Sequence, residues 1–170
     1  MRRLVGAGDL IPEFDSSGVL PSGRYPATAV EIEHRFVATF PASHTRRAIY
    51  DGWRQRREEL FALVEVEYEW VDGSFVTSKS EPSDLDVVTF VAADRIAALR
   101  AADQARVGEL TVGAYPRITF GCHSFLTVVT DESQTNEHNF YLWMRGYWDK
   151  WWTDDRTVTS KGYLEVRGPA

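Results

Sequence analysis

Two strand-like segments joined by one polar loop limit the fold of this 170-residue chain more than any other feature. In the first, VEVEYEWVD (residues 64–72), apolar residues alternate with glutamates. This two-residue period is typical of a β-strand with one buried face. The second, DLDVVTFVA (residues 84–92), is rich in β-branched residues, which indicates a more deeply buried strand. We expect the two strands to be neighbours in one sheet.

Helical periodicity flanks these strands on both sides. Thr28 and Glu31 have the spacing of a capping box, which predicts a helix over residues 29–40. A second helix is expected from Ser43 onwards, with apolar side chains inward and its arginines outward. After the strands, residues 93–107 predict a further helix.

Residues 136–152 form an aromatic-rich segment that also has helical spacing. Its expected apolar face contains Phe140, Met144, Trp148 and Trp151, and is widened by Trp143, Tyr147 and Trp152. Such a helix is typical of a packed core, because aromatic side chains bury large areas. A base-stacking surface or a cofactor slot is the rarer alternative.

Strand patterns return at residues 124–129 (SFLTVV) and 162–166 (GYLEV). The mixture of helices and strands predicts an α/β or α+β fold, with a mixed β-sheet packed with helices. The length is that of a single domain, residues 1–170. Prolines, glycines and serines punctuate its start, so residues 1–27 are expected to be an extended N-terminal segment that wraps around the domain.

The net charge of −6 argues against sequence-independent nucleic-acid binding by the whole surface, because such binding relies on many Lys and Arg contacts to phosphate. A local basic patch is left open on the second helix, at Arg46, Arg47, Arg54, Arg56 and Arg57. One interpretation is RNA binding that depends on Arg54 and Arg57. The commoner one is a solvated helix face on which neighbouring glutamates balance the arginines.

The chain contains no apolar run of about 18 residues, and near its start it has no hydrophobic segment of a secretory signal. Its single cysteine, Cys122, cannot form an internal disulfide. These features predict a cytoplasmic protein without a membrane span. Cys122 has no metal-ligand spacing with the four histidines, which argues against a zinc site.

Asp84 and Asp86 lie two residues apart at the start of the second strand, so their carboxylates project from the same face. Without a cation the two charges would repel each other. Paired carboxylates that hold two Mg²⁺ ions roughly 3.5 to 4 Å apart assist in-line displacement at phosphorus. The pair therefore predicts a two-metal magnesium site.

Gly73 and Ser74, between the strands, fit the same chemistry. Glycine lets the backbone approach a phosphate chain, and the next N–H and hydroxyl can donate hydrogen bonds to phosphate oxygens. Alone, a Gly-Ser step or an Asp-x-Asp is most often a solvated turn. The order found here, a strand, Gly-Ser, nine residues and Asp-x-Asp before an apolar strand, favours a nucleotide site.

This ordered pattern resembles the signature of the nucleotidyltransferase superfamily, which includes DNA polymerase beta, the antibiotic nucleotidyltransferases and the minimal nucleotidyltransferases of bacterial toxin–antitoxin loci. More closely, the chain resembles a small bacterial branch of that superfamily. The likeness extends to PEF and GVLPSGRYPAT near the start, to the arginine-bearing helix, and to WWTDDR and KGYLEV near the end. The resemblance implies a nucleotidyltransferase-like fold.

The resemblance also implies roles for individual residues. Gly73 and Ser74 would hold the triphosphate of a nucleoside triphosphate (NTP), and Asp84 with Asp86 would bind magnesium. Lys79, in the loop, and Lys161, before the last strand, could reach a phosphate, although surface solvation is the commoner reason for such lysines.

A third carboxylate on a neighbouring strand is usual in the superfamily, where it binds one metal and helps to deprotonate the acceptor. The corresponding strand here, TFGCHSFLTVV, has no acid before Asp131. His123 could act as the base, because an imidazole titrates near neutral pH. The alternative for His123 is a solvent-facing or hydrogen-bonded side chain, and Asp131 or Glu132 could instead approach from a strand end.

These site residues and the resemblance lead to two alternative functions. The first is a magnesium-dependent nucleotidyltransferase that moves a nucleoside monophosphate from an NTP to RNA, to a protein or to a small molecule. The second is a catalytically impaired nucleotidyltransferase-fold module that binds a nucleotide or a partner protein, for example in a toxin–antitoxin or phage-defence system. The missing third carboxylate is the reason for the second.

Overall fold

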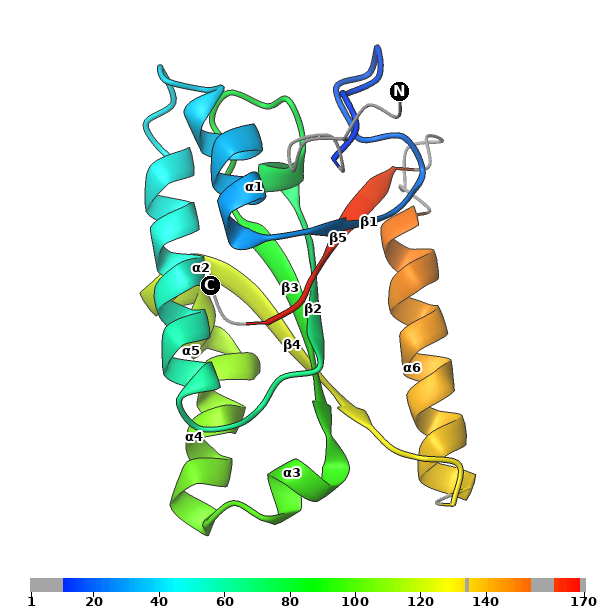
Figure 1. The fold of residues 1–170 in the computed structure, drawn as a ribbon. Helices are drawn as coiled ribbons and strands as arrows, with labels where there is room; N and C mark the ends of the chain where they lie inside the picture. Colours follow the sequence, from blue (N-terminus) through cyan, green and yellow to red (C-terminus); the bar gives the residue numbers. More distant parts are fainter. Residues whose placement is uncertain (1–10, 134, 154–160, 169–170) are drawn as a thin grey trace, which may run out of the picture.

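The computed structural model describes residues 11–133, 135–153 and 161–168, and builds them around one five-stranded mixed sheet (Figure 1). The sheet order is β1-β5-β2-β3-β4. Its strands are β1 (Gly23–Ala27), β2 (Tyr68–Asp72), β3 (Leu85–Ala92), β4 (Cys122–Val129) and β5 (Gly162–Val166). β2 is antiparallel to both of its neighbours, β3 and β5, whereas β1–β5 and β3–β4 are parallel pairs. The predicted mixed α/β architecture is confirmed.

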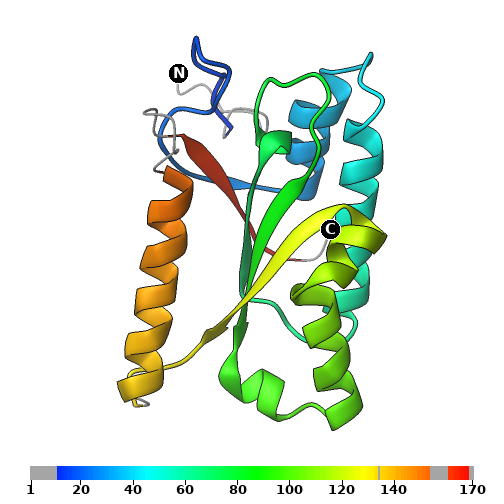
Figure 2. The same ribbon diagram turned by 180° about the vertical axis from the view of Figure 1, so that it is seen from behind.

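Helices cover both faces of the sheet (Figures 1 and 2). One face carries α6, and the other carries α1, α2, α4 and α5. The helices are α1 (Ala29–Glu33), α2 (Arg46–Phe61), α3 (Ala93–Ala97), α4 (Ala101–Thr111), α5 (Ala114–Phe120) and α6 (Thr135–Thr153). A π-helical turn (His34–Ala38) continues α1, and a 3₁₀ turn (Ser74–Val76) follows β2. None of the helices in the described ranges is long and apolar enough to cross a membrane.

The expected pairing of the two strand-like segments is confirmed, because β2 and β3 are antiparallel neighbours. The one-sided burial expected for the first segment is confirmed for residues 64–67, but it is wrong for β2. β2 lies in the middle of the sheet, and helices cover both faces, so Glu69 has no exposed surface. A buried carboxylate must be paired, and its partners come from α2.

Three arginines of α2, Arg46, Arg56 and Arg57, point inward, which corrects the expectation that the arginines of this helix face solvent. The Arg56 Nη1 donates to Glu69 Oε1 at 2.7 Å, and Arg57 Nε lies 2.8 Å from Glu69 Oε2. Burial alone would raise the pKa of Glu69, but the two guanidinium charges hold it below its ordinary value. With Arg57 buried, the proposed RNA-binding pair of Arg54 and Arg57 does not form one exposed surface.

The capping box at the start of α1 is confirmed. The Thr28 N–H donates to Glu31 Oε2 at 2.7 Å, and the Glu31 N–H donates to Thr28 Oγ1 at 3.2 Å. The single helix expected over residues 93–107 is two helices, α3 and α4, with a break at residues 98–100. The segment expected from Ser43 becomes helical at Arg46, whose N–H donates to the Ser43 hydroxyl.

The N-terminal segment wraps the domain only in part. Residues 11–22 contain no helix and pair with the loop after β2 through one bridge, Val19 with Thr77. Residues 23–27, expected to be part of the extended N-terminal segment, form the edge strand β1, where a proline is tolerated because one side of the strand needs no partner. Residues 1–10 and residues 154–156 of WWTDDR lie outside the described residues.

The aromatic helix α6 is confirmed, but its inner face matches the expected one only in part. Tyr141, Trp148 and Trp152 are buried against the sheet in a cluster that includes Trp70 and Phe90. Phe140, Trp143, Tyr147 and Trp151 are exposed, and successive rings of this second stripe stack at centroid distances of 5.6 to 6.1 Å. The core interpretation therefore holds only for the buried stripe of α6, because the helix has more aromatic side chains than one face can bury.

Candidate functional site

Three polar side chains form a row across one end of the sheet. Asp72, the last residue of β2, pairs in register with Asp86 of β3, and Asp86 pairs in register with His123 of β4. Side chains of residues that pair across strands project from the same face of the sheet. Trp70 and Val88, two residues along from Asp72 and Asp86, pack under α6, so the row lies on the face that α6 covers.

Asp86 and His123 of this row, together with Asp84, form a group that could hold a metal ion. Each offers one ligand atom, and these atoms all lie within 4.8 Å of one another. His123 Nδ1 is 3.3 Å from Asp86 Oδ1. All three side chains are partly exposed, which leaves a path for an ion from solvent. Burial, and then the charge of Asp84, raises the pKa of Asp86. A cation at this point would relieve both effects.

Asp72 is the most deeply buried acid of the row, with 2% of its surface exposed. The Lys161 ammonium lies 2.9 Å from Asp72 Oδ2, while Asp72 Oδ1 has no hydrogen-bond partner among the described residues. Burial, with a contribution from Asp86, raises the pKa of Asp72 to about 7, although Lys161 acts in the opposite direction. Asp72 therefore ends the row with one compensated and one unsatisfied oxygen.

Gly73 brings the chain back against Asp86. Its φ of 87° is in the region that favours glycine, and a Cβ there would lie 2.9 Å from the backbone nitrogen of Asp86. The Ser74 hydroxyl donates to Asp84 Oδ1 at 2.9 Å and accepts from the Ser83 N–H at 3.0 Å. The Gly-Ser turn thus holds Asp84 in place, and a phosphate contact by Ser74 stays a prediction.

Three other predicted residues lie away from the row. Lys79 is exposed, and among the described residues no hydrogen bond or ion pair joins its side chain to the carboxylates. Asp131 and Glu132 follow the far end of β4, about eight residues or roughly 25 Å from His123. They therefore do not supply the third carboxylate, and this alternative is corrected.

Sequence reasoning missed Asp72 and the contact that Lys161 makes with it. The sequence contains a signal for Asp72. It directly precedes Gly73, and it lies two residues after Trp70, so both side chains project from the same face of the strand. The position opposite Asp86 follows only from the β2–β3 register, and the sequence does not give that register.

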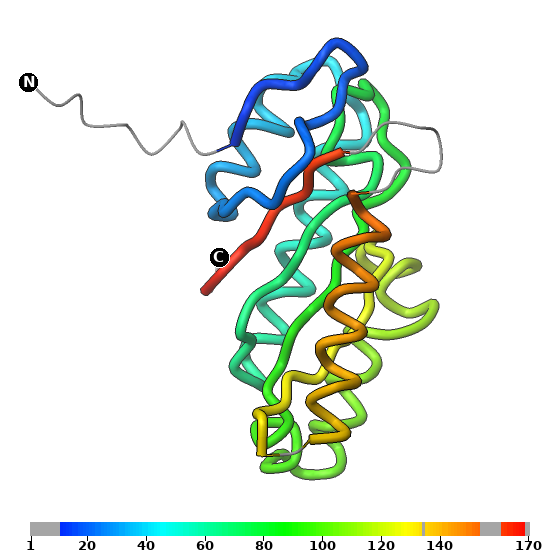
Figure 3. Tube along the Cα trace, turned by 90° about the vertical axis from the view of Figure 1, so that its right-hand side faces the viewer, coloured from blue at the N-terminus to red at the C-terminus, as the bar shows by residue number. Residues whose placement is uncertain are grey.

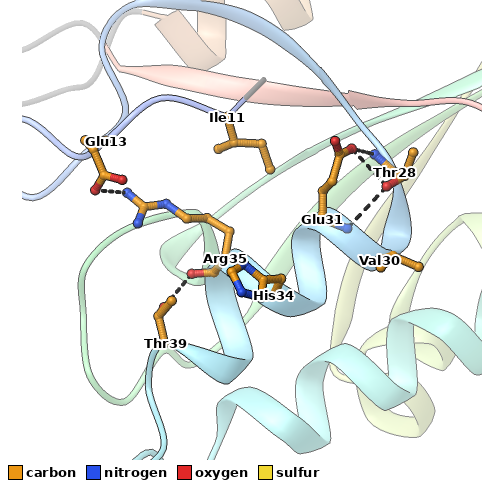
Figure 4. A pocket seen from close by; sticks show the side chains of 8 residues that line it. All are labelled: Ile11, Glu13, Thr28, Val30, Glu31, His34, Arg35 and Thr39. Carbon is orange, nitrogen blue, oxygen red and sulfur yellow. Dashed lines mark hydrogen bonds and ion pairs between the residues drawn. The ribbon is translucent and has the colours of Figure 1, made fainter. Parts of the chain in front are cut away.

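A separate cavity of about 580 Å³ lies beside α1 (Figure 4). Three of its charged residues already have partners, since Arg35 contacts Glu13 at 2.8 Å and Glu31 accepts a hydrogen bond from the Thr28 N–H. None of its lining residues belongs to the carboxylate row. The row is therefore the better candidate for chemistry.

The ionisation of Asp72 is expected to make the protein less stable as the pH rises. Its pKa is about 7 in the folded protein and 3.8 ordinarily, so the folded state binds a proton that the unfolded chain releases. The free energy of unfolding then falls between about pH 4 and pH 7, by about 2 to 4 kcal/mol. Asp72→Asn removes the titrating group and this slope, which urea denaturation at several pH values measures. An unchanged slope in the variant would contradict the assignment.

Comparison with known protein families identifies a match over most of the chain. The model of a protein family described as a family of unknown function (DUF6932) matches residues 12–167. No curated protein and no solved structure matches the chain.

Proposed function

The chain belongs to the DUF6932 family of unknown function, and from its own site we propose that it is a magnesium-dependent nucleotidyltransferase. It transfers a nucleoside monophosphate from an NTP to an acceptor and releases pyrophosphate. The observation that carries the proposal is the group Asp84, Asp86 and His123, whose ligand atoms lie within 4.8 Å of one another.

The residues present fit a hard divalent cation. Two carboxylates side by side, both partly buried, are a donor set that suits Mg²⁺, which fills its remaining positions with water and substrate phosphate. Asp84 and Asp86 would hold the ion, which would neutralise charge on the phosphates during displacement. The mutual repulsion of these two carboxylates supports a cation between them.

His123 is the candidate general base. Its Nδ1 faces Asp86 Oδ1 at 3.3 Å, and its side chain is 38% exposed, so the other ring nitrogen is available to an acceptor. In the proposed step the acceptor oxygen attacks the α-phosphorus while its proton passes to His123. The bond between the α-phosphorus and the bridging oxygen breaks, and pyrophosphate leaves.

The Gly-Ser turn would bind the triphosphate. Glycine is needed at position 73 because the chain passes closely against Asp86, and the Ser74 N–H, 3.5 Å from Asp84 Oδ1, is the group of this turn that would donate to a phosphate. Lys79 is exposed in the loop that follows and could meet a phosphate only if the loop moves toward the row. RNA, a protein or a small molecule can supply the acceptor hydroxyl, and a reducing cytoplasm suits the single buried Cys122.

One observation favours a second candidate, a nucleotide-binding module that has lost turnover, as in a toxin–antitoxin or phage-defence system. The β4 position beside Asp86, where the superfamily resemblance implies a carboxylate, is His123. A histidine there supplies a base but no negative charge for an ion. The two candidates differ in whether bound NTP is consumed.

The test is to incubate the protein with an NTP labelled at the α-phosphate, in a cell extract, with magnesium or with EDTA. We expect label to enter an acceptor only with magnesium, and pyrophosphate to be released in equal amount. Magnesium-dependent NTP binding by calorimetry without any labelling would support the inactive module instead. Labelling that persists in EDTA would contradict the metal-dependent mechanism.

A further inference from the structure

The ion pair between Lys161 and Asp72 is buried at the end of the carboxylate row. Both side chains are largely removed from water, with 18% and 2% of their surfaces exposed. Removing two charges from water costs several kcal/mol per ion, so a buried pair is a weak source of stability. A pair in such a place is better explained by the site that it borders.

The sheet fixes the position of this ion pair relative to the proposed metal site. Asp72 stands opposite Asp86 in the β2–β3 register, on the side away from His123. Lys161 directly precedes β5, and its backbone N–H donates to Thr153 O at the end of α6 at 3.2 Å. Figure 3 shows α6 ending near the start of β5, at this end of the sheet. The Lys161 backbone is therefore anchored at this end of the sheet by one main-chain hydrogen bond, and Asp72 holds its ammonium beside the row.

A two-metal site needs carboxylate oxygens for a second ion roughly 3.5 to 4 Å from the first. On one side of Asp86 the neighbour is the imidazole of His123, which faces Asp86 Oδ1. On the other side it is Asp72, one of whose oxygens is occupied by the Lys161 ammonium. Asp72 Oδ1 is buried and has no hydrogen-bond partner among the described residues, so a carboxylate oxygen without a partner lies on this side of Asp86.

We infer that the Lys161 ammonium occupies the place of the second divalent ion, so that the site binds a single Mg²⁺ at Asp84 and Asp86. The inference rests on the proposed function, and it replaces the two-metal site expected from the sequence. Lys161 supplies the second positive charge permanently. The charge of Asp72 is then compensated in the absence of any metal.

The test counts bound Mn²⁺, a paramagnetic substitute for Mg²⁺, by electron paramagnetic resonance at pH 8. The unaltered protein should bind one ion per chain. Lys161→Ala frees Asp72 and should bind two, with the spectral broadening of two neighbouring spins. Lys161→Arg, which keeps the charge, and Lys150→Ala, which removes an exposed lysine of α6, should each bind one.

Each other result has a distinct meaning. Two ions in the unaltered protein, or one ion in folded Lys161→Ala, would overturn the inference and leave the proposed metal site standing. No bound ion in the unaltered protein would overturn the proposed function together with the inference. If Lys161→Ala does not fold, Lys161→Met keeps the apolar stem and is counted in its place, with the double variant Lys161→Met/Asp72→Asn expected to return to one ion.

Discussion

Asp86→Asn is expected to lower the rate of nucleotidyl transfer about a thousand-fold or more. The substitution keeps the shape of the side chain but removes the carboxylate that Asp84 and His123 both approach. A metal ion contributes several kcal/mol of charge stabilisation in the transition state, and each 1.4 kcal/mol is about a tenfold change in rate. Single-turnover transfer of a labelled nucleotide measures the loss.

The loss should not come from unfolding. Burial and the charge of Asp84 disfavour the ionised form of Asp86, so a neutral asparagine should fold at least as stably in the absence of metal. Asp51→Asn on the exposed face of α2 is the matched control, because it makes the same chemical change away from the row. Equal transfer rates for Asp86→Asn and Asp51→Asn would contradict the assigned role.

Glu69→Gln is expected to reduce the free energy of unfolding by about 3 to 5 kcal/mol. Glu69 is fully buried between Arg56 and Arg57 and also accepts from the Thr89 hydroxyl at 2.9 Å. Without its charge, two buried guanidinium groups lose their only carboxylate among the described residues. Urea denaturation at neutral pH measures the change.

A glutamate nearby provides the comparison. Glu67 is about one-third exposed and lies 3.4 Å from the partly exposed Arg95, so Glu67→Gln should change stability by less than about 1 kcal/mol. The pKa of Glu69 is lowered by its partners, so its contribution is present above the ordinary pKa and lost as the pH falls through the lowered value. If both variants lose equal stability, the buried cluster is not the cause.

The elements of the fold were largely predictable, because strand alternation and helix caps are local signals. The burial of both faces of β2 could not be predicted from local signals. Periodicity assigns charged residues to the surface, and Glu69 becomes an interior residue only because α2 covers that face with two arginines. The edge strand β1 was missed for a related reason, since its Gly23 and Pro26 are typical of loops and only the pairing with β5 makes it a strand.

One part of the candidate site could likewise be predicted from the sequence, and the other part could not. That Asp84 and Asp86 share a face, and that Gly73 turns closely against them, follows from spacing along one stretch of chain. The positions of His123, Asp72 and Lys161 depend on which strands are neighbours and in which register. Strand order and register are long-range properties of the fold, and a shift of the register by one residue would move each side chain to the other face of the sheet.

The central claim is that Asp84 and Asp86 hold a divalent ion that carries an NTP. A crystal structure with Mn²⁺ and a non-hydrolysable NTP, measured at the manganese absorption edge, tests it most directly. We predict one anomalous peak within about 2.4 Å of oxygens from both carboxylates, with the triphosphate against Gly73 and Ser74. A peak elsewhere, or a row without ion or nucleotide at saturating concentrations of both, would contradict the claim.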